Sequence, residues 1–419
     1  MLLLATSFRA GFAGFSFDIR EVSQLAPLNR GNLDMPVEAI ATAAGTTTME
    51  ITVSKFELLR ELTATQGVVE RKTTIPILSN YLFEAAGDKL ALTATDLDLS
   101  LRTSCVAKVK KEGSCTVPAR KLHDYVKLLP DADITIKLLE NHWVSIRCGR
   151  SNTKMVGMAR SNFPSLPAFP TAGVVKIPAQ ILRGMIAKTG FAIASEESRY
   201  TLNGALMVLK PESITMVATD GHRLSHVERG GTKFEGVSGE MKTLVPKKAM
   251  DELKSLLDST DAEEIEFAKD ESTLYFRIGG RLLTSRQLTG QFPNYEAVLP
   301  KDNNKVVTVH GDELNAAISR VAQFADERSR AVRLRLEKGE LKLSASSTEM
   351  GESEDSIETD YNGDTLAIGF NAQYLLDFLK ATGSGDVKLE FKDPQSAGQM
   401  RPAEGEDYKY RYIVMPMRI

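Results

Sequence analysis

The histidines of this chain offer the first candidate chemistry. His222 and His226 are four residues apart with Asp220 nearby, a spacing that would place two metal ligands on one face of a helix. However, Asp220-Gly221 is a turn signal, and it predicts a strand end rather than a continuous helix. We therefore expect no metal site at these histidines.

Catalytic motifs give no stronger candidate. The sequence contains neither a nucleophile elbow nor a phosphate-binding loop, and His123 and His310 are isolated. The three cysteines are odd in number and lack Cys-x-x-Cys spacing, which argues against a zinc site and a disulfide framework: Cys105, Cys115 and Cys148. We expect reduced, buried cysteines in a cytoplasmic protein that is not an enzyme and needs no cofactor.

Basic residues recur at equivalent positions of two predicted helices. Arg120 and Lys127 lie seven residues apart on the first, over 119–129, with Lys121 beside them. The second, over 247–257, has the matching set Lys247, Lys248 and Lys254. A single charged stripe is most often a solvated helix face. Its repetition favours a shared basic surface, and a net charge of −3 then requires an acidic remainder, an arrangement that suits phosphate contact.

The basic stripes belong to a longer repeat. An apolar-alternating segment ends at Thr95-Asp96, and a similar segment about 125 residues later ends at Thr219-Asp220. A third segment of the same shape ends at Ser346-Ser347. Solenoid repeats run roughly 20 to 50 residues, so this longer step predicts three repeated domains.

Length and composition agree with several globular domains. A chain of 419 residues exceeds the roughly 250–300 residues at which single cores stop growing, and no apolar run is long enough to span a membrane. We interpret residues 1–48 as a disordered extension or a misassigned start upstream of Met49. The expected domains are 49–170, 171–299 and 300–419.

Each repeat shows the same order of elements. A first helix begins near Ser54, Pro178 or Asp312, where a capping box of Ser54 with Glu57, a first-turn proline and a capping aspartate are expected. Alternating strands follow, then the second helix, 371–381 in the third repeat, and further strands. Two helices packed on antiparallel sheets predict the α+β class for every domain.

Several motifs in a fixed order extend this interpretation to a known family. The chain resembles the bacterial DNA polymerase III beta subunit family, the sliding clamps, along essentially all of residues 49–419. The motifs are Thr74-Ile75-Pro76-Ile77-Leu78-Ser79-Asn80, Val117-Pro118-Ala119-Arg120-Lys121, Arg199-Tyr200-Thr201-Leu202-Asn203-Gly204, Val217-Ala218-Thr219-Asp220-Gly221-His222-Arg223-Leu224 and Val414-Met415-Pro416-Met417-Arg418-Ile419. The resemblance implies three domains of the DNA clamp fold. It also implies a head-to-tail homodimer that forms a six-domain ring.

The resemblance also implies how the ring meets DNA. Duplex DNA threads the hole without sequence specificity, so the basic helix faces are expected to line it. The family has a basic residue before its Ile-Pro-Ile motif, which falls on Lys72, and a DNA-contacting loop that falls on Arg199 and Tyr200. Thr201 stands where some relatives carry a second aromatic residue, a departure that weakens the expected contact with single strands.

A hydrophobic cleft for partner peptides is the next implied site. By resemblance, it binds the DNA polymerase III alpha subunit, the clamp loader and other proteins with a clamp-binding motif. The implied residues are Leu202, Thr219, Gly221, His222, Arg223, Leu224, Pro293, Val298, Asn371, Tyr374, Met415, Pro416, Met417 and Arg418. A methionine-rich surface suits a site that accepts several partners in turn. Residues 395–400 lack the apolar strand expected for one wall, and ordinary core residues remain the alternative at each position.

Opposite charges on two repeats bear on assembly. Repeat three carries an acidic segment and repeat one a basic cluster, and a head-to-tail ring would bring those repeats together. The expected interface residues are Arg147, Arg150, Lys154, Met155, Phe324, Glu349, Glu352, Glu354 and Asp355. The resemblance implies a processivity factor that tethers a replicative polymerase; a non-replicative DNA-binding ring or scaffold is the alternative.

Overall fold

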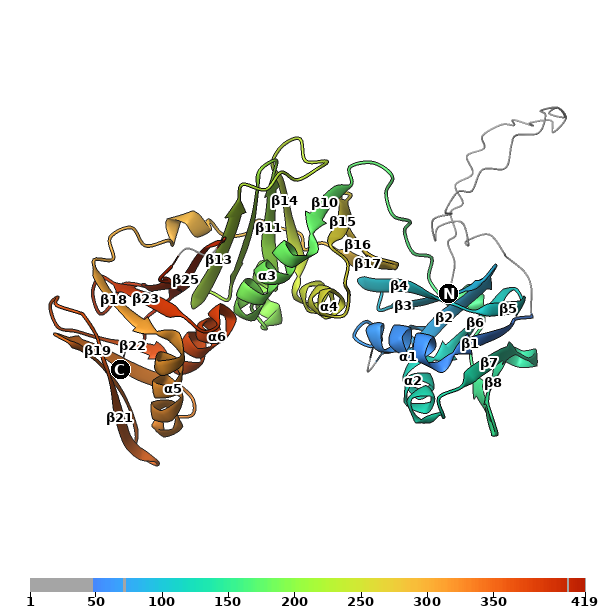
Figure 1. Ribbon diagram of the computed structural model, residues 1–419, viewed down its shortest axis with the longest axis horizontal. Coiled ribbons are helices and arrows are strands. Elements are labelled where there is room, and N and C mark those ends of the chain that lie inside the picture. The colour runs from blue at the N-terminus through green and yellow to red at the C-terminus, as the bar shows by residue number, and fades with distance from the viewer. Residues whose placement is uncertain (1–47, 71–72, 405–406, 419) are drawn as a thin grey trace, which may run out of the picture. The chain divides into compact units, whose positions relative to one another are not determined.

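The computed structural model (Figure 1) describes residues 48–70, 73–404 and 407–418, without the side chains of 197–199. The predicted extension, apart from Thr48, and the predicted DNA contact Lys72 lie outside the described residues. Among the described residues, a strand, a helix, several antiparallel strands, a second helix and three strands follow one another three times, as the repeat predicts; the first repeat has one extra short strand at Lys108–Lys111. No helix in the described ranges is long and apolar enough to cross a membrane.

The described strands form four antiparallel sheets. The five-stranded sheet has the order β5-β1-β7-β8-β9 and consists of β5 (Lys108–Lys111), β1 (Glu50–Ser54), β7 (Asp133–Leu138), β8 (Trp143–Cys148) and β9 (Ser151–Val156). The four-stranded sheet has the order β21-β20-β19-β22 and consists of β21 (Gly351–Glu358), β20 (Glu340–Ser347), β19 (Ala331–Glu337) and β22 (Leu366–Asn371). In both sheets an outermost strand, β9 or β21, has one neighbour among the described strands.

The other two sheets each run across a junction between domains. The first consists, in order, of β10 (Val175–Pro178), β15 (Glu264–Lys269), β16 (Thr273–Ile278), β17 (Arg281–Arg286), β4 (Leu99–Val106), β3 (Lys89–Thr95), β2 (Asn80–Ala86) and β6 (Gly113–Pro118). The second consists of β14 (Met241–Pro246), β11 (Gly204–Lys210), β12 (Ser213–Thr219), β13 (Arg223–Gly230), β25 (Lys409–Val414), β24 (Gly398–Pro402), β23 (Asp386–Phe391) and β18 (Lys305–His310). The junction pairs are β17 with β4 and β13 with β25, so backbone hydrogen bonds join successive domains.

The six α-helices of the described residues pack in three pairs on these sheets, and Figure 1 shows the pairs. They are α1 (Lys55–Ala64) with α2 (Ala119–Leu128), α3 (Ala179–Thr189) with α4 (Lys247–Asp258), and α5 (Gly311–Val321) with α6 (Ala372–Thr382). Apolar residues at helical spacing supply the buried faces. In α5, for example, Leu314, Ala317, Ile318 and Val321 are all buried, as predicted.

The predicted helix starts are correct to within one or two residues, but their caps differ. The Ser54 side chain makes no capping hydrogen bond. Pro178 occupies the N-cap position itself and ends β10, whereas His310 is the N-cap of α5 and leaves Asp312 in the first turn. In five of the six helices no N-cap side chain bonds the helix backbone, because a strand runs directly into each helix and packing sets its start.

Candidate nucleic-acid and peptide interfaces

The predicted basic face of α2 is exposed. Ala119, Leu122 and Val126 turn to the core, which leaves Arg120, Lys121 and Lys127 on the solvent side. Within the part of the chain that the structure describes, no ion pair or side-chain hydrogen bond engages these three cations. Phosphates attract such cations without regard to sequence, so α2 presents a surface suited to duplex DNA.

The matching face of α4 is partly neutralised. Lys247 pairs with Asp251 one turn along the helix, Nζ to Oδ2 at 3.1 Å. Lys248 reaches across the domain junction to Asp96 and, at 3.8 Å, to Glu70. Lys254 is exposed and has no ion partner in the described ranges. The two stripes are therefore equivalent in sequence but not in available charge.

The predicted DNA loop is only partly described. Residues 197–202 form a 3₁₀-helix, in which the Tyr200 side chain is 53% exposed. The side chain of Arg199 is not described, and Lys72 lies outside the described residues. An exposed tyrosine here is compatible with contact to a nucleotide. The DNA contacts expected of Arg199 and Lys72 stay predictions.

A tight turn follows the end of β12 at Asp220, where the sequence raised a metal site as a hypothesis. The Asp220 Oδ1 atom accepts hydrogen bonds from the backbone N–H groups of His222, at 2.9 Å, and Arg223, at 3.0 Å. Gly221 adopts a φ of 89°, which favours glycine, and Thr219 closes the turn through its hydroxyl. His226 lies in β13, where burial lowers the pKa of its imidazole. No cluster of metal-ligating residues occurs in the described parts of the chain.

The Arg223 side chain joins the second and third domains. Its guanidinium bonds Asp220 at 3.0 Å and Asp377 of α6 at 2.5 Å, and donates to the Phe191 carbonyl at 2.7 Å. It also stacks over the Tyr374 ring, 4.4 Å from the centroid. The Arg223 side chain is 10% exposed. Arg223 and Tyr374 therefore contribute to the junction of the second and third domains, and their place in the peptide cleft stays a prediction.

The equivalent aspartate of the first repeat, Asp96, lies at the junction of the first and second domains. Asp96, the counterpart of Asp220, also caps its turn, with backbone bonds of 2.9 Å to Asp98 and 2.6 Å to Leu99, and it pairs with Lys248. In the third repeat, Ser347 takes this place and accepts the turn bonds through its hydroxyl. The repeated Thr-Asp pair was the available sign of these junction aspartates, whereas Asp377 carried no local signal.

The C-terminal tail is anchored at two backbone positions. After β25, the N–H of Met415 donates to the His222 carbonyl at 2.9 Å, and the N–H of Met417 donates to the Gly369 carbonyl at 2.8 Å. The Met415 side chain stays 43% exposed. The tail predicted to line the cleft is thus positioned between the 219–224 turn and β22.

An apolar cluster adjoins the turn on the face of the sheet away from the helices. Its buried members include Leu224, Phe292 and Ile413, with Leu202 and Leu299 packed against them. Two predicted cleft residues are chain neighbours of residues in this cluster. Pro293 follows Phe292, and Val298, which is 39% exposed, precedes Leu299. In the stretch 395–400, Ala397 packs against this cluster, whereas Met400 of β24 is buried in the main core on the helix side. Asn371 caps α6 by accepting from Gln373 N.

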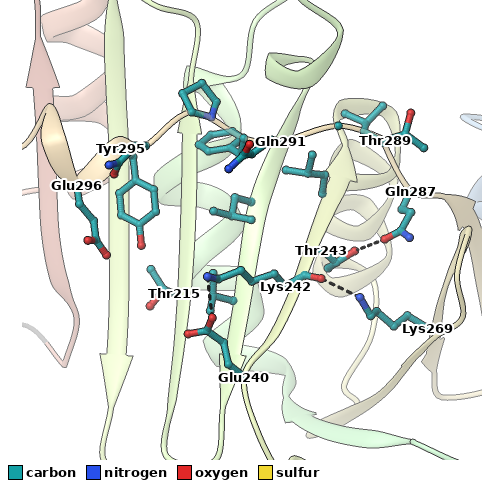
Figure 2. A pocket seen from close by; sticks show the side chains of 18 of the residues that line it. Thr215, Glu240, Lys242, Thr243, Lys269, Gln287, Thr289, Gln291, Tyr295 and Glu296 are labelled. Carbon is teal, nitrogen blue, oxygen red and sulfur yellow. Dashed lines mark hydrogen bonds and ion pairs between the residues drawn. The ribbon is translucent and has the colours of Figure 1, made fainter.

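A cavity of about 720 Å³ lies beside this cluster, and Figure 2 shows side chains that line it, with the segment 287–296 along one side. Leu206, Val208, Leu244 and Phe292 belong to both the cavity lining and the apolar cluster. Polar contacts border it: Lys242 pairs with Glu240 at 2.7 Å, and Thr243 donates to Gln287 at 3.0 Å. Sequence reasoning did not anticipate this cavity, because segments far apart in the chain form its walls.

Two outer strands carry opposite charge. The cross-strand register puts Arg147 of β8 and Lys154 of β9 on one face of the five-stranded sheet. It likewise puts Glu352 and Glu354 on one face of β21. Arg150 precedes β9, Glu349 precedes β21, Met155 is half-buried in β9, and Phe324 is 37% exposed near α5. Asp355 instead turns to α5, where it pairs with Arg320 at 2.6 Å. Most of the predicted interface residues therefore gather at the two outer strands.

Three repeated two-helix domains, joined through shared antiparallel sheets, define the class of DNA clamps. Family models for the N-terminal, central and C-terminal domains of the DNA polymerase III beta subunit match residues 49–167, 176–294 and 296–418. The chain belongs to the DNA polymerase III beta subunit family.

Curated relatives and solved structures agree with this membership. The beta sliding clamp of Caulobacter vibrioides is 35% identical over 377 residues, and that of Pseudomonas aeruginosa 36% over 373, covering 88% of this chain and 100% of each relative. A P. aeruginosa sliding clamp bound to griselimycin superposes with a TM-score of 0.82 at 35% identity, covering 88% of this chain and 100% of that one. A C. crescentus clamp with PEG bound to a putative beta-motif tethering region superposes with a TM-score of 0.82 at 34% identity. The match covers 89% of this chain and 100% of that chain.

Proposed function

We propose that this protein is a processivity factor: two copies form a ring around duplex DNA and tether the replicative polymerase. The observation that carries the proposal is the basic face of α2, whose three cations have no acidic partner among the described residues. Such a face attracts phosphates while leaving base edges unread, which permits sliding. No catalytic step is required of the protein, and a cytoplasmic location follows from a role on the chromosome.

Ring closure is proposed through the two outer strands. β9 and β21 each have an unoccupied side among the described strands, and an exposed edge pairs readily with another chain. Arg147, Arg150 and Lys154 would meet Glu349, Glu352 and Glu354, so unlike charges favour the head-to-tail pairing of first and third domains. Two copies with three domains each then make a six-domain ring.

Partner tethering is proposed at the surface formed by the 219–224 turn, the apolar cluster and the tail. The partners would be the DNA polymerase III alpha subunit, the clamp loader and other proteins with short apolar motifs. Leu202, Leu224, Val298 and Met415 supply apolar contact. His222 contributes through its backbone, whereas Arg223 and Tyr374 hold the two sides of the site in place.

Retention on DNA of different topology tests the proposal. Protein placed by a clamp loader on a nicked circular plasmid should stay bound during gel filtration at high salt and dissociate once the plasmid is linearised. Arg120→Glu with Lys127→Glu should reduce loading and retention, because phosphate attraction becomes repulsion. Lys108→Glu with Lys111→Glu, the same charge change on exposed β5, is the control. Equal retention on circular and linear DNA would support the alternative of a scaffold that does not encircle DNA.

A further inference from the structure

A hollow of about 680 Å³ lies where the C-terminal tail meets the outer face of the four-stranded sheet. We refer to it as the tail hollow. Its walls combine tail residues with β19, β22 and the loop before β24, and include Arg333, Ala367, Gly369, Gln395, Met417 and Arg418. Only Met417 and Arg418 of these six belong to the cleft predicted from the sequence. The hollow therefore extends the proposed peptide surface onto β19.

The strand register explains why the sheet is hollow at this place. Arg333 of β19 lies opposite Gly369 of β22, and Gly369 forms an antiparallel bridge with Met417 on its other side. Residues opposite one another across strands project to the same face, with strands about 4.8 Å apart. Gly369, in the middle of this row, has no side chain, and the next residue on the same face of β22 is the small Ala367. A trough consequently separates the Arg333 side chain from that of Met417.

The charge of the tail hollow is one-sided. Arg333 and Arg418 are exposed, and neither forms an ion pair or side-chain hydrogen bond within the described ranges. No carboxylate belongs to the lining. Arg335, two residues along the same face of β19, differs because its Nε pairs with Glu337 at 2.6 Å. Arg333 therefore keeps its guanidinium available for a carboxylate from outside the chain, which it can bind with two parallel hydrogen bonds.

We propose that the tail hollow binds an acidic side chain next to the apolar anchor of a partner peptide, with Arg333 as the residue that selects for the negative charge. The inference rests on the proposed peptide site, because the tail is shared by both surfaces. Met417 and the prolines of the lining contact the aliphatic part of the acidic residue, while Arg333 binds its carboxylate and Arg418 adds positive charge nearby.

Paired synthetic peptides test this inference. Each fluorescein-labelled peptide carries an anchor of two leucines and one phenylalanine, with two aspartates or two asparagines added before or after it. Fluorescence anisotropy with the full-length protein should show that an aspartate peptide binds roughly three- to tenfold more tightly than its asparagine counterpart. Arg333→Gln should bring that ratio close to one, because the aspartate peptide loses affinity more than its asparagine counterpart does.

Arg335→Gln is the matched control, since this arginine lies on the same face of the same strand but is already paired. It should keep the aspartate preference, and all variants should retain the wild-type Tm. Equal binding of aspartate and asparagine peptides to the unmodified protein, or a preference that survives Arg333→Gln, would overturn the inference. Failure of every peptide to bind would instead contradict the proposed peptide site itself.

Discussion

At the scale of single residues, Arg223 has a structural contact that its sequence motif did not predict. Arg223 resembles a cleft residue in sequence, yet its guanidinium bonds carboxylates from two domains and stacks on Tyr374. A charge that is this poorly solvated stabilises a structure only while its partners remain in place. The side chain that holds the junction thus also determines where the 219–224 turn presents its apolar neighbours.

We expect Arg223→Gln to destabilise the protein through this junction. The substitution leaves Asp220 and Asp377, 17% and 22% exposed, without their shared cation. The loss should be about 2 kcal/mol, seen as a Tm lower by a few degrees in calorimetry. Arg286→Gln is the control, because its pair with Asp98 spans 3.6 Å between side chains that are 71% and 76% exposed. Equal shifts in the two variants would contradict a junction role.

A second residue makes the other junction sensitive to pH. Glu252 of α4 packs against Gly67 of the first domain so closely that a Cβ at Gly67 would overlap the carboxylate. Burial raises the pKa of Glu252 to about 7, with Asp251 adding to the effect and Lys248 opposing it. The folded protein therefore binds this proton more tightly than the unfolded chain, whose pKa is near 4.5. The resulting stabilisation is complete below about pH 4.5 and is lost as the pH rises through 7.

Glu252→Gln should accordingly raise the Tm relative to wild type at pH 8 and leave it nearly unchanged at pH 5. The amide keeps the shape of the neutral acid and removes the buried charge. Thermal unfolding followed by circular dichroism at both pH values measures the difference. Glu235→Gln, at a carboxylate that is 77% exposed, should show no such dependence on pH. A constant difference between Glu252→Gln and wild type would mean that Glu252 ionises normally.

At the scale of elements, strand pairing positions the tail. β25 lies between β13 and β24, so its last residue, Val414, delivers Met415 to the His222 carbonyl. The bond from Met417 to Gly369 then holds the following residues against β22. The end of the described chain is consequently held in the proposed peptide surface, although it belongs to no strand.

Deletion of residues 415–419 should therefore weaken peptide binding without affecting assembly. Buried peptide anchors typically contribute about 2 kcal/mol or more, so the affinity for a partner's clamp-binding peptide should fall more than tenfold. Isothermal titration measures the affinity, and sedimentation velocity checks that the dimer persists, since the β9 and β21 edges remain intact. Wild-type affinity in the truncated protein would place the partner site elsewhere.

At the scale of the whole molecule, the two long sheets and the two outer strands have different roles. Continuous pairing of β17 with β4 and of β13 with β25 joins the three domains within the chain. The outer strands β9 and β21 remain, and the third repeat has Ser347 where the other repeats have a junction aspartate. A second copy is thus expected to meet the chain by charge at its outer strands rather than by a third copy of the aspartate contact.

Charge reversal at one outer strand tests this assembly. Glu352→Lys with Glu354→Lys should convert the dimer to monomers in sedimentation velocity, because like charges then face each other across the proposed interface. Mixing this variant with one carrying Arg147→Glu and Lys154→Glu should restore dimers. Glu212→Lys with Glu271→Lys, the same change at exposed sites elsewhere, is the control. Persistent dimers in the Glu352→Lys, Glu354→Lys variant alone would refute the β9–β21 interface.

The sequence alone determined the repeat, the helix pairs and the family, because these depend on local periodicity and on short motifs that survive in order. Helix faces such as Leu314, Ala317 and Ile318 followed from 3.6-residue spacing. Tertiary structure decided which charges are available: Lys248 and Lys121 occupy matching positions, but only Lys248 has a carboxylate across a junction. It also decided that Arg223 is a junction residue and that Gly369 opens a hollow beside Arg333. Such outcomes depend on partners more than a hundred residues away or on neighbouring strands, and no local pattern encodes those distances.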